Sequence, residues 1–177
     1  MSVAGLVLGI VATVLAVLSL GWQVTLLRLQ RPRPKLTAVV GRLTRDGLVT
    51  NDASAEVRES LVGAAEQADE SPLIIGVKVI NAGRSSFHVA GWAIRSEHDG
   101  NSLVPVEKPI AGADVPHDVA PGGSAVFLTE LAHAHRFAAA GEGTEDGTRR
   151  LVLTVSSGTR TYTTKPVAPE LFSTRDG

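Results

Sequence analysis

The 177-residue sequence contains no cysteine and few aromatic residues. Without thiols the chain can form neither disulfides nor zinc–thiolate sites, and it has no thiol nucleophile. Aromatic residues make up 4% of the chain, so a hydrophobic core must be built mainly from Val, Leu, Ile and Ala. The lack of cysteine does not by itself assign a cellular compartment.

Familiar catalytic motifs are also missing from the sequence. It contains no Gly-x-Ser-x-Gly elbow and no GxxxxGK[ST] or GxGxxG phosphate-binding loop. His133 and His135 are the nearest approach to a metal-binding pair, but two helical positions two apart point about 200° away from each other. Glu145 and Asp146 lie in a charged, glycine-containing stretch that favours a solvated loop. We therefore expect a protein that is not an enzyme and that uses no metal or cofactor.

Charge is distributed unevenly, although the formal net charge is only −1. No charged side chain precedes Arg28, and four of the 17 basic residues follow within a short stretch at Arg28, Arg31, Arg33 and Lys35. From Leu36 onward there are 13 basic and 18 acidic residues. A mildly acidic domain lacks the electrostatic footprint of a nucleic-acid binder, so no nucleic-acid partner is expected. The basic cluster fits a membrane surface better.

An apolar run, uncharged up to Arg28, extends from Val3 to Leu29. As a helix it would be somewhat longer than the ~30 Å hydrocarbon core of a bilayer. In lipid every backbone polar group must be paired within its own segment, which favours a helix. A cleaved signal peptide needs a basic start and a short apolar core, whereas Met1–Gly5 carry no basic side chain and the run is long. We expect residues 1–30 to be an uncleaved, single-pass signal-anchor helix in the lipid bilayer.

The basic flank predicts an orientation for this helix. Lys and Arg are retained on the cytoplasmic side, so we expect the N-terminus outside and the C-terminal domain in the cytoplasm. Trp22 suits the headgroup region near that end of the helix. Pro32 and Pro34 should stop the helix and stiffen a basic linker over residues 31–35. The basic residues either bind anionic lipid specifically or only set the topology.

Small residues recur along one face of the apolar run, at spacings of 4, 3, 4 and 3. They are Gly5, Gly9, Ala12, Ala16 and Ser19. A stripe of this kind lets two helix backbones approach closely, which drives association inside lipid. The alternative is that Gly and Ala are simply common in membrane helices. The stripe therefore predicts either self-association or a partner helix, or has no specific role.

Residues 36–167 have the pattern of a β domain, with short β-branched runs separated by turn residues. A segment over 51–71 is Ala- and Glu-rich, which predicts either a short amphipathic helix or a mobile excursion. Thr129 is expected to cap a helix that runs to about Ala140 and ends at Gly141. Residues 109–118 are expected to be loop and 168–177 a flexible tail. The expected strands cover 35–43, 48–50, 73–80, 87–95, 103–106, 125–128, 150–155 and 160–165.

The strand expected over Phe87–Arg95 has a simple alternation. It places Phe87, Val89, Gly91 and Ala93 on one face, with His88, Ala90, Trp92 and Ile94 on the other. Of the two roles open to Trp92, a core residue between two sheets is favoured over an exposed contact.

Three stretches carry a resemblance to a known class of domain. They are VKVINAGRSSFHVAGWAIR, the turn VAPGGSAVF and the closing hairpin, within Leu73–Pro166. Together they resemble small bacterial Ig-like sandwich domains, and the whole arrangement looks like small actinobacterial or actinophage membrane-anchored proteins of unknown role. The resemblance implies a mainly β fold, an antiparallel Ig-like β-sandwich with one or two short inserted helices behind the transmembrane helix. Such domains are commonly extracellular, which is the alternative to the cytoplasmic location.

Two functions remain open from the sequence. The first is a non-enzymatic single-pass membrane protein that presents an Ig-like β-sandwich as a protein-interaction module. The second is an oligomerising membrane effector of phage exclusion or host defence. Both require the lipid bilayer, and both involve a protein partner or self-association through the helix.

Overall fold

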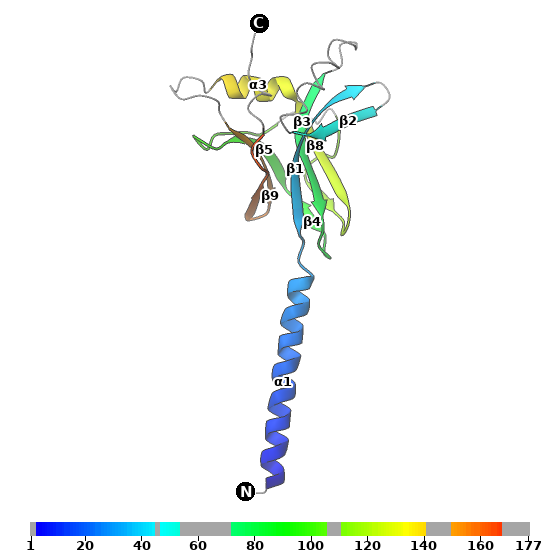
Figure 1. Cartoon of the computed structure of the whole chain (residues 1–177), viewed down its shortest axis with the longest axis vertical. Coiled ribbons are helices and arrows are strands. Elements are labelled where there is room, and N and C mark those ends of the chain that lie inside the picture. The colour runs from blue at the N-terminus through cyan, green and yellow to red at the C-terminus, as the bar shows by residue number, and fades with distance from the viewer. Residues whose placement is uncertain (1–2, 45–46, 54–71, 106–110, 141–149, 168–177) are drawn as a thin grey trace.

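The computed structural model describes residues 3–44, 47–53, 72–105, 111–140 and 150–167 (Figure 1). Within them the chain is mainly β, with an N-terminal apolar helix followed by antiparallel sheets, as the sequence predicts. The elements, in order, are α1 (Val3–Leu29), β1 (Pro34–Thr44), β2 (Gly47–Asp52), β3 (Leu73–Asn81), β4 (Phe87–Val89), β5 (Gly91–Ser96), β6 (Ser102–Leu103), β7 (His117–Val119), β8 (Ser124–Glu130), α3 (Leu131–Ala139), β9 (Leu151–Ser157) and β10 (Arg160–Thr163).

Helix α1 extends away from the β domain as a separate rod (Figure 1). It ends at Leu29, three residues before Pro32, where proline cannot continue the hydrogen-bond pattern of a helix. Strand β1 starts at Pro34, so Pro34 and Lys35 of the expected linker lie in the sheet. Only four residues, 30–33, therefore separate the helix from the first strand.

The first sheet has the strand order β2-β1-β3-β8, with every neighbouring pair antiparallel. Strand β3 is an inner strand of this sheet, between β1 and β8. Most of its residues are buried, as its β-branched run suggests. Its residues pair with β1 on one side, as in Val40 with Ile75, and with β8 on the other, as in Val77 with Phe127.

The second sheet has the order β10-β9-β5-β6, and β4 and β7 form a separate two-stranded sheet. Apolar side chains from the three sheets and from α3 meet in one core. Phe127 and Val77 of the first sheet, Leu153 of the second and Phe87 of the third are almost completely buried there. Trp92 is buried in the same core, which confirms its expected role.

The expected strand over Phe87–Arg95 is wrong as a single strand. It breaks at Ala90: β4 pairs with β7, whereas β5 pairs with β9 and β6. The alternation slips by one residue at the break, so Phe87, Val89, Trp92 and Ile94 all point into one core. Strands that change sheets do so at breaks of this kind, here at Ala90 between β4 and β5.

Helix α3 confirms the expected helix but not its start. Thr129 is a buried residue of β8, and Glu130 occupies the N-cap position without a side-chain capping bond. The last helical residue is Ala139, and Gly141 lies outside the described residues. The helix packs onto the core through side chains three and four positions apart: Leu131, Ala134 and Ala138.

Three other element boundaries differ from those expected from the sequence. Asn51 and Asp52 continue β2, and the rest of the predicted helix or excursion, residues 54–71, lies outside the described residues, as does the tail 168–177. His117 and Asp118 belong to β7, where a loop was expected. Of the strand expected over 103–106, Leu103 lies in β6, Val104 and Pro105 do not, and Val106 lies outside the described residues.

Candidate functional site

Among the described residues, one helix is long and apolar enough to cross a membrane. Its qualifying stretch is Val7–Leu26, 20 residues, and none of it is buried against the rest of the chain. At ~1.5 Å per residue this stretch spans about 30 Å, the thickness of a bilayer core. By length and composition α1 fits a membrane anchor or a signal sequence.

The small-residue stripe lies along one face of α1, as helix geometry requires, and every member is exposed: Gly5, Gly9, Ala12, Ala16 and Ser19. A Cβ added at Gly5 or Gly9 would meet no atom within 4 Å outside the helix backbone. The Thr13 hydroxyl donates to the Gly9 carbonyl oxygen at 2.8 Å and so covers one polar group of this face. No other part of the described chain packs on the stripe.

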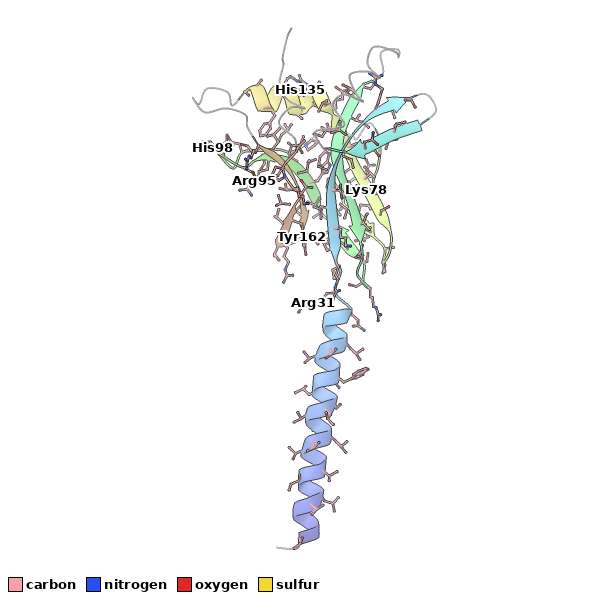
Figure 2. The ribbon with its side chains drawn as sticks, in the orientation of Figure 1. Arg31, Lys78, Arg95, His98, His135 and Tyr162 are labelled. Atoms are coloured by element: carbon pink, nitrogen blue, oxygen red, sulfur yellow. The ribbon has the colours of Figure 1, made fainter. Side chains whose placement is uncertain are left out.

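Of the residues expected at the membrane surface, the basic ones lie at the junction of α1 with the β domain, and Trp22 lies about two turns earlier in α1. Trp22 is 67% exposed and lies four residues before the end of the apolar stretch. Arg28 is part of α1. The side chains of Arg31, Arg33 and Lys35 are all exposed, and Figure 2 shows Arg31 between the end of α1 and the sheets.

Asn81, the last residue of β3, holds this junction together. Its fully buried side chain accepts hydrogen bonds through Oδ1 from the backbone N–H groups of Arg33 (3.3 Å) and Gly83 (3.0 Å). Through Nδ2 it donates to the carbonyl oxygens of Ser85 (2.8 Å) and Val119 (3.0 Å). One amide therefore connects the linker, its own turn and the end of β7.

The backbone of Asn81 extends the same network. Its N–H donates to the Gly123 carbonyl (3.0 Å), and its carbonyl accepts from the Gly122 N–H (2.8 Å). Next to it, the Ala82 N–H donates to the Arg33 carbonyl at 2.9 Å. The β3–β4 turn, the β7–β8 turn and the linker thus form one hydrogen-bonded unit. The sequence places Asn81 only in a turn, because contacts 38 to 48 residues away leave no local signal.

Gly83 allows the linker to lie directly on this turn. A Cβ at Gly83 would come within 2.6 Å of three linker backbone atoms, the Arg31 carbonyl oxygen, the Arg33 nitrogen and the Pro32 Cα. Contacts that short do not occur, so the close approach requires the absence of a side chain. The direction of α1 relative to the sheets is therefore set by packing as well as by the stiffness of the prolines.

The histidines do not converge in the described structure. His88 of β4 and Asp118 of β7 face each other across the small sheet, with Nδ1 and Oδ1 2.8 Å apart and both side chains exposed. His133 lies with its Nδ1 3.3 Å from the Thr129 hydroxyl. Within the described ranges, no group of three or more metal-ligating side chains could hold an ion.

Comparison with known proteins identifies no relative: no protein-family model, no curated protein and no solved structure matches the chain.

Proposed function

We propose that this chain is a non-enzymatic, single-pass membrane protein that presents an Ig-like β-sandwich as a protein-interaction module at the membrane. The observation that carries the proposal is the form of α1. Its described side chains are exposed along the whole length, so about 20 apolar residues have no partner within the chain. Apolar surface of this extent requires a lipid or protein environment.

Strand order supports an Ig-like domain. In that fold the first sheet contains strands A, B and E and the second contains G, F and C, with a buried Trp on strand C. Here β1-β3-β8 and β10-β9-β5 have the same order, and Trp92 lies buried on β5. The chain has no cysteine and so lacks the inter-sheet disulfide of antibody domains, and α3 occupies the connection between β8 and β9.

The mechanism we propose is recruitment. An anchor confines the domain to the membrane, so a weak contact gains from a raised effective concentration. The edge strand β2 offers one docking surface. Val49 on this strand is 57% exposed, and the outward-facing backbone groups of β2 can pair with an added strand. Helix α3 is the other described surface added to the sandwich. Segment 51–71, which the sequence suggests for the same role, lies for the most part outside the described residues.

The anchor is tested by alkaline extraction of membranes from cells that express the full chain. We expect the protein to stay in the membrane pellet, and a Val11→Asp/Leu15→Asp variant to be extracted, because each buried carboxylate costs about 2.5–3.5 kcal/mol at the helix centre. Extraction of the parent chain from the membrane pellet would contradict the proposal. Cleavage on the C-terminal side of α1 that releases the β domain from the membrane would contradict it too.

The interaction role is tested by photo-crosslinking in native membranes. A photoreactive residue at Val49 should give a discrete adduct with another protein, whereas one at Asn101, exposed in the β5–β6 turn, should not. An absence of adducts from Val49 in a chain that remains in the membrane would contradict docking on the β2 edge.

The second candidate function is an oligomerising membrane effector, favoured by the small-residue stripe that faces open space. In this case several α1 helices would pack together and perturb the bilayer when the β domain detects a signal. Loss of membrane potential on induced expression, together with oligomers, supports the effector. Recovery of a partner without toxicity supports the adaptor.

A further inference from the structure

The end of the β domain that faces α1 is built from four segments far apart in the sequence: 31–35, 81–86, 119–124 and 156–161. The first three are joined by the hydrogen bonds around Asn81. The fourth is the β9–β10 hairpin, whose tip points toward the same end (Figure 1). Strand β10 lies against β4 through an edge-to-face contact of Tyr162 with Phe87, whose ring centroids are 5.3 Å apart.

These four segments contain five basic residues and no acidic residue. All five side chains are exposed: Arg31, Arg33, Lys35, Arg84 and Arg160. Within the described part of the chain, none of them forms an ion pair or a side-chain hydrogen bond. Most of their neighbours in these segments are Gly, Ala, Ser, Thr and Pro, so the basic side chains are the longest groups at this end.

The rest of the domain has the opposite charge balance. After residue 35, outside the four segments, there are 11 basic and 18 acidic residues. Helix α3, which begins after Glu130, lies at the end of the domain away from α1 (Figure 1). The four segments are therefore the basic part of a domain whose sequence is acidic as a whole, and Asp118, directly before segment 119–124, is paired with His88.

We propose that Arg31, Arg33, Lys35, Arg84 and Arg160 form a basic face that seats the β domain on anionic lipid headgroups of the leaflet from which α1 emerges. The inference rests on the proposed membrane anchor. Residues 30–33 span at most roughly 18 Å between Leu29 and Pro34, so the face stays close to the headgroups. A linker this short lets the face come within one Debye length of the surface, where each basic residue adds to the attraction by an anionic leaflet.

The basic face gives the β domain a second attachment to the membrane, in addition to the linker. Any protein with this linker would place Arg31, Arg33 and Lys35 near the membrane surface. These three residues also favour the predicted orientation of α1. Arg84 and Arg160 reach the surface only because the fold brings two distant turns to the same end. Contacts at both sides of the junction would hold the domain upright and present the α3 end to the cytoplasm.

The test uses the full chain reconstituted in phosphatidylcholine vesicles with and without phosphatidylglycerol. The chain has no cysteine, so Thr159→Cys in the β9–β10 turn places one fluorophore at the proposed contact, and spin-labelled headgroups quench it. We expect stronger quenching in the anionic vesicles, lost at high salt. A fluorophore at Ala139→Cys on α3 should show no such change.

The decisive variant is Arg84→Gln/Arg160→Gln, measured at the phosphatidylglycerol content that half-saturates quenching in the parent. The ratio of seated to unseated domain should fall about 25-fold, because each basic residue contributes roughly a factor of five at an anionic surface. The control Arg95→Gln/Arg136→Gln removes the same charge from exposed positions outside the basic face and should leave quenching unchanged.

Each other outcome overturns the inference. Equal quenching in the two kinds of vesicle means that the basic face does not bind anionic lipid. The occupant of the face would then be an acidic protein partner. An equal loss in the control variant means that net charge alone matters. A chain that does not float with vesicles of either composition contradicts the anchor itself, which separates failure of the proposed function from failure of the basic face.

Discussion

At the scale of single residues, Asn81 determines how the β domain meets the helix. Its side chain satisfies four backbone groups, two donors and two acceptors, in three segments of the chain. Neither Asp nor Leu could replace it, because only an amide offers an acceptor and two donors from a side chain of this length. Unsatisfied backbone groups would remain buried in either case.

We predict that Asn81→Ala lowers the free energy of unfolding by about 2–4 kcal/mol, since it leaves buried backbone groups without partners. Asn81→Asp should be at least as destabilising at neutral pH, because a carboxylate cannot donate to the Ser85 and Val119 carbonyl oxygens. Thermal unfolding in detergent measures both variants. Asn101→Ala, in an exposed turn, is the control, and equal stability of Asn81→Ala and that control would contradict the role of Asn81.

Gly83 supplies a second prediction at this scale. Gly83→Ala should destabilise the junction and expose the linker to protease, because the new Cβ would collide with the backbone of Arg31–Arg33. Gly91→Ala is a matched control, since its Cβ would meet only the Ser156 hydroxyl at 3.4 Å. Limited proteolysis at the basic linker should be several-fold faster for Gly83→Ala than for Gly91→Ala. Identical cleavage rates would show that the linker does not need this contact.

At the scale of elements, α1 has two different faces. One carries the small residues from Gly5 to Ser19, and the other carries larger side chains such as Val7 and Val11, which are half exposed or more. Two helices can approach closely only along the small-residue face, because a bulky side chain there would hold the backbones apart.

We predict that Gly5→Ile/Gly9→Ile weakens self-association of the full chain in detergent and in crosslinked membranes. By analogy with small-xxx-small interfaces, the loss should be about 1–2 kcal/mol, or roughly tenfold in the association constant. Gly21→Ile adds the same side chain on the opposite face of α1, where an added Cβ meets no atom within 4 Å, and should have no effect. If the two variants associate equally, the stripe has no role in packing.

At the scale of the whole molecule, the two ends of α1 differ in charge. No basic residue precedes the apolar run, and Arg28, Arg31, Arg33 and Lys35 follow it. We predict that the β domain is cytoplasmic. In intact cells a membrane-impermeant maleimide should label Ser2→Cys, and it should label Asn101→Cys only after lysis. The reverse labelling pattern would place the β domain outside and contradict this orientation.

The sequence by itself determined the apolar helix, its end before Pro32, the strand-rich domain and most strand positions. These features depend on local composition and periodicity, which act over a few residues. The strand over Phe87–Arg95 could not be predicted correctly, because its break at Ala90 depends on which sheet each half joins. The same limit applies to Thr129, which looks like a helix cap but lies in β8.

Only the tertiary structure decided the junction and the basic face. Asn81 and Gly83 look like ordinary turn residues until the linker and the β7–β8 turn are brought against them. Arg84 and Arg160 lie 76 positions apart in the sequence, and only the fold brings the β3–β4 turn and the β9–β10 hairpin that carry them to the same end of the domain (Figure 1). Hydrogen bonds and electrostatic fields depend on distance in space, so a site assembled from separate turns has no pattern along the chain.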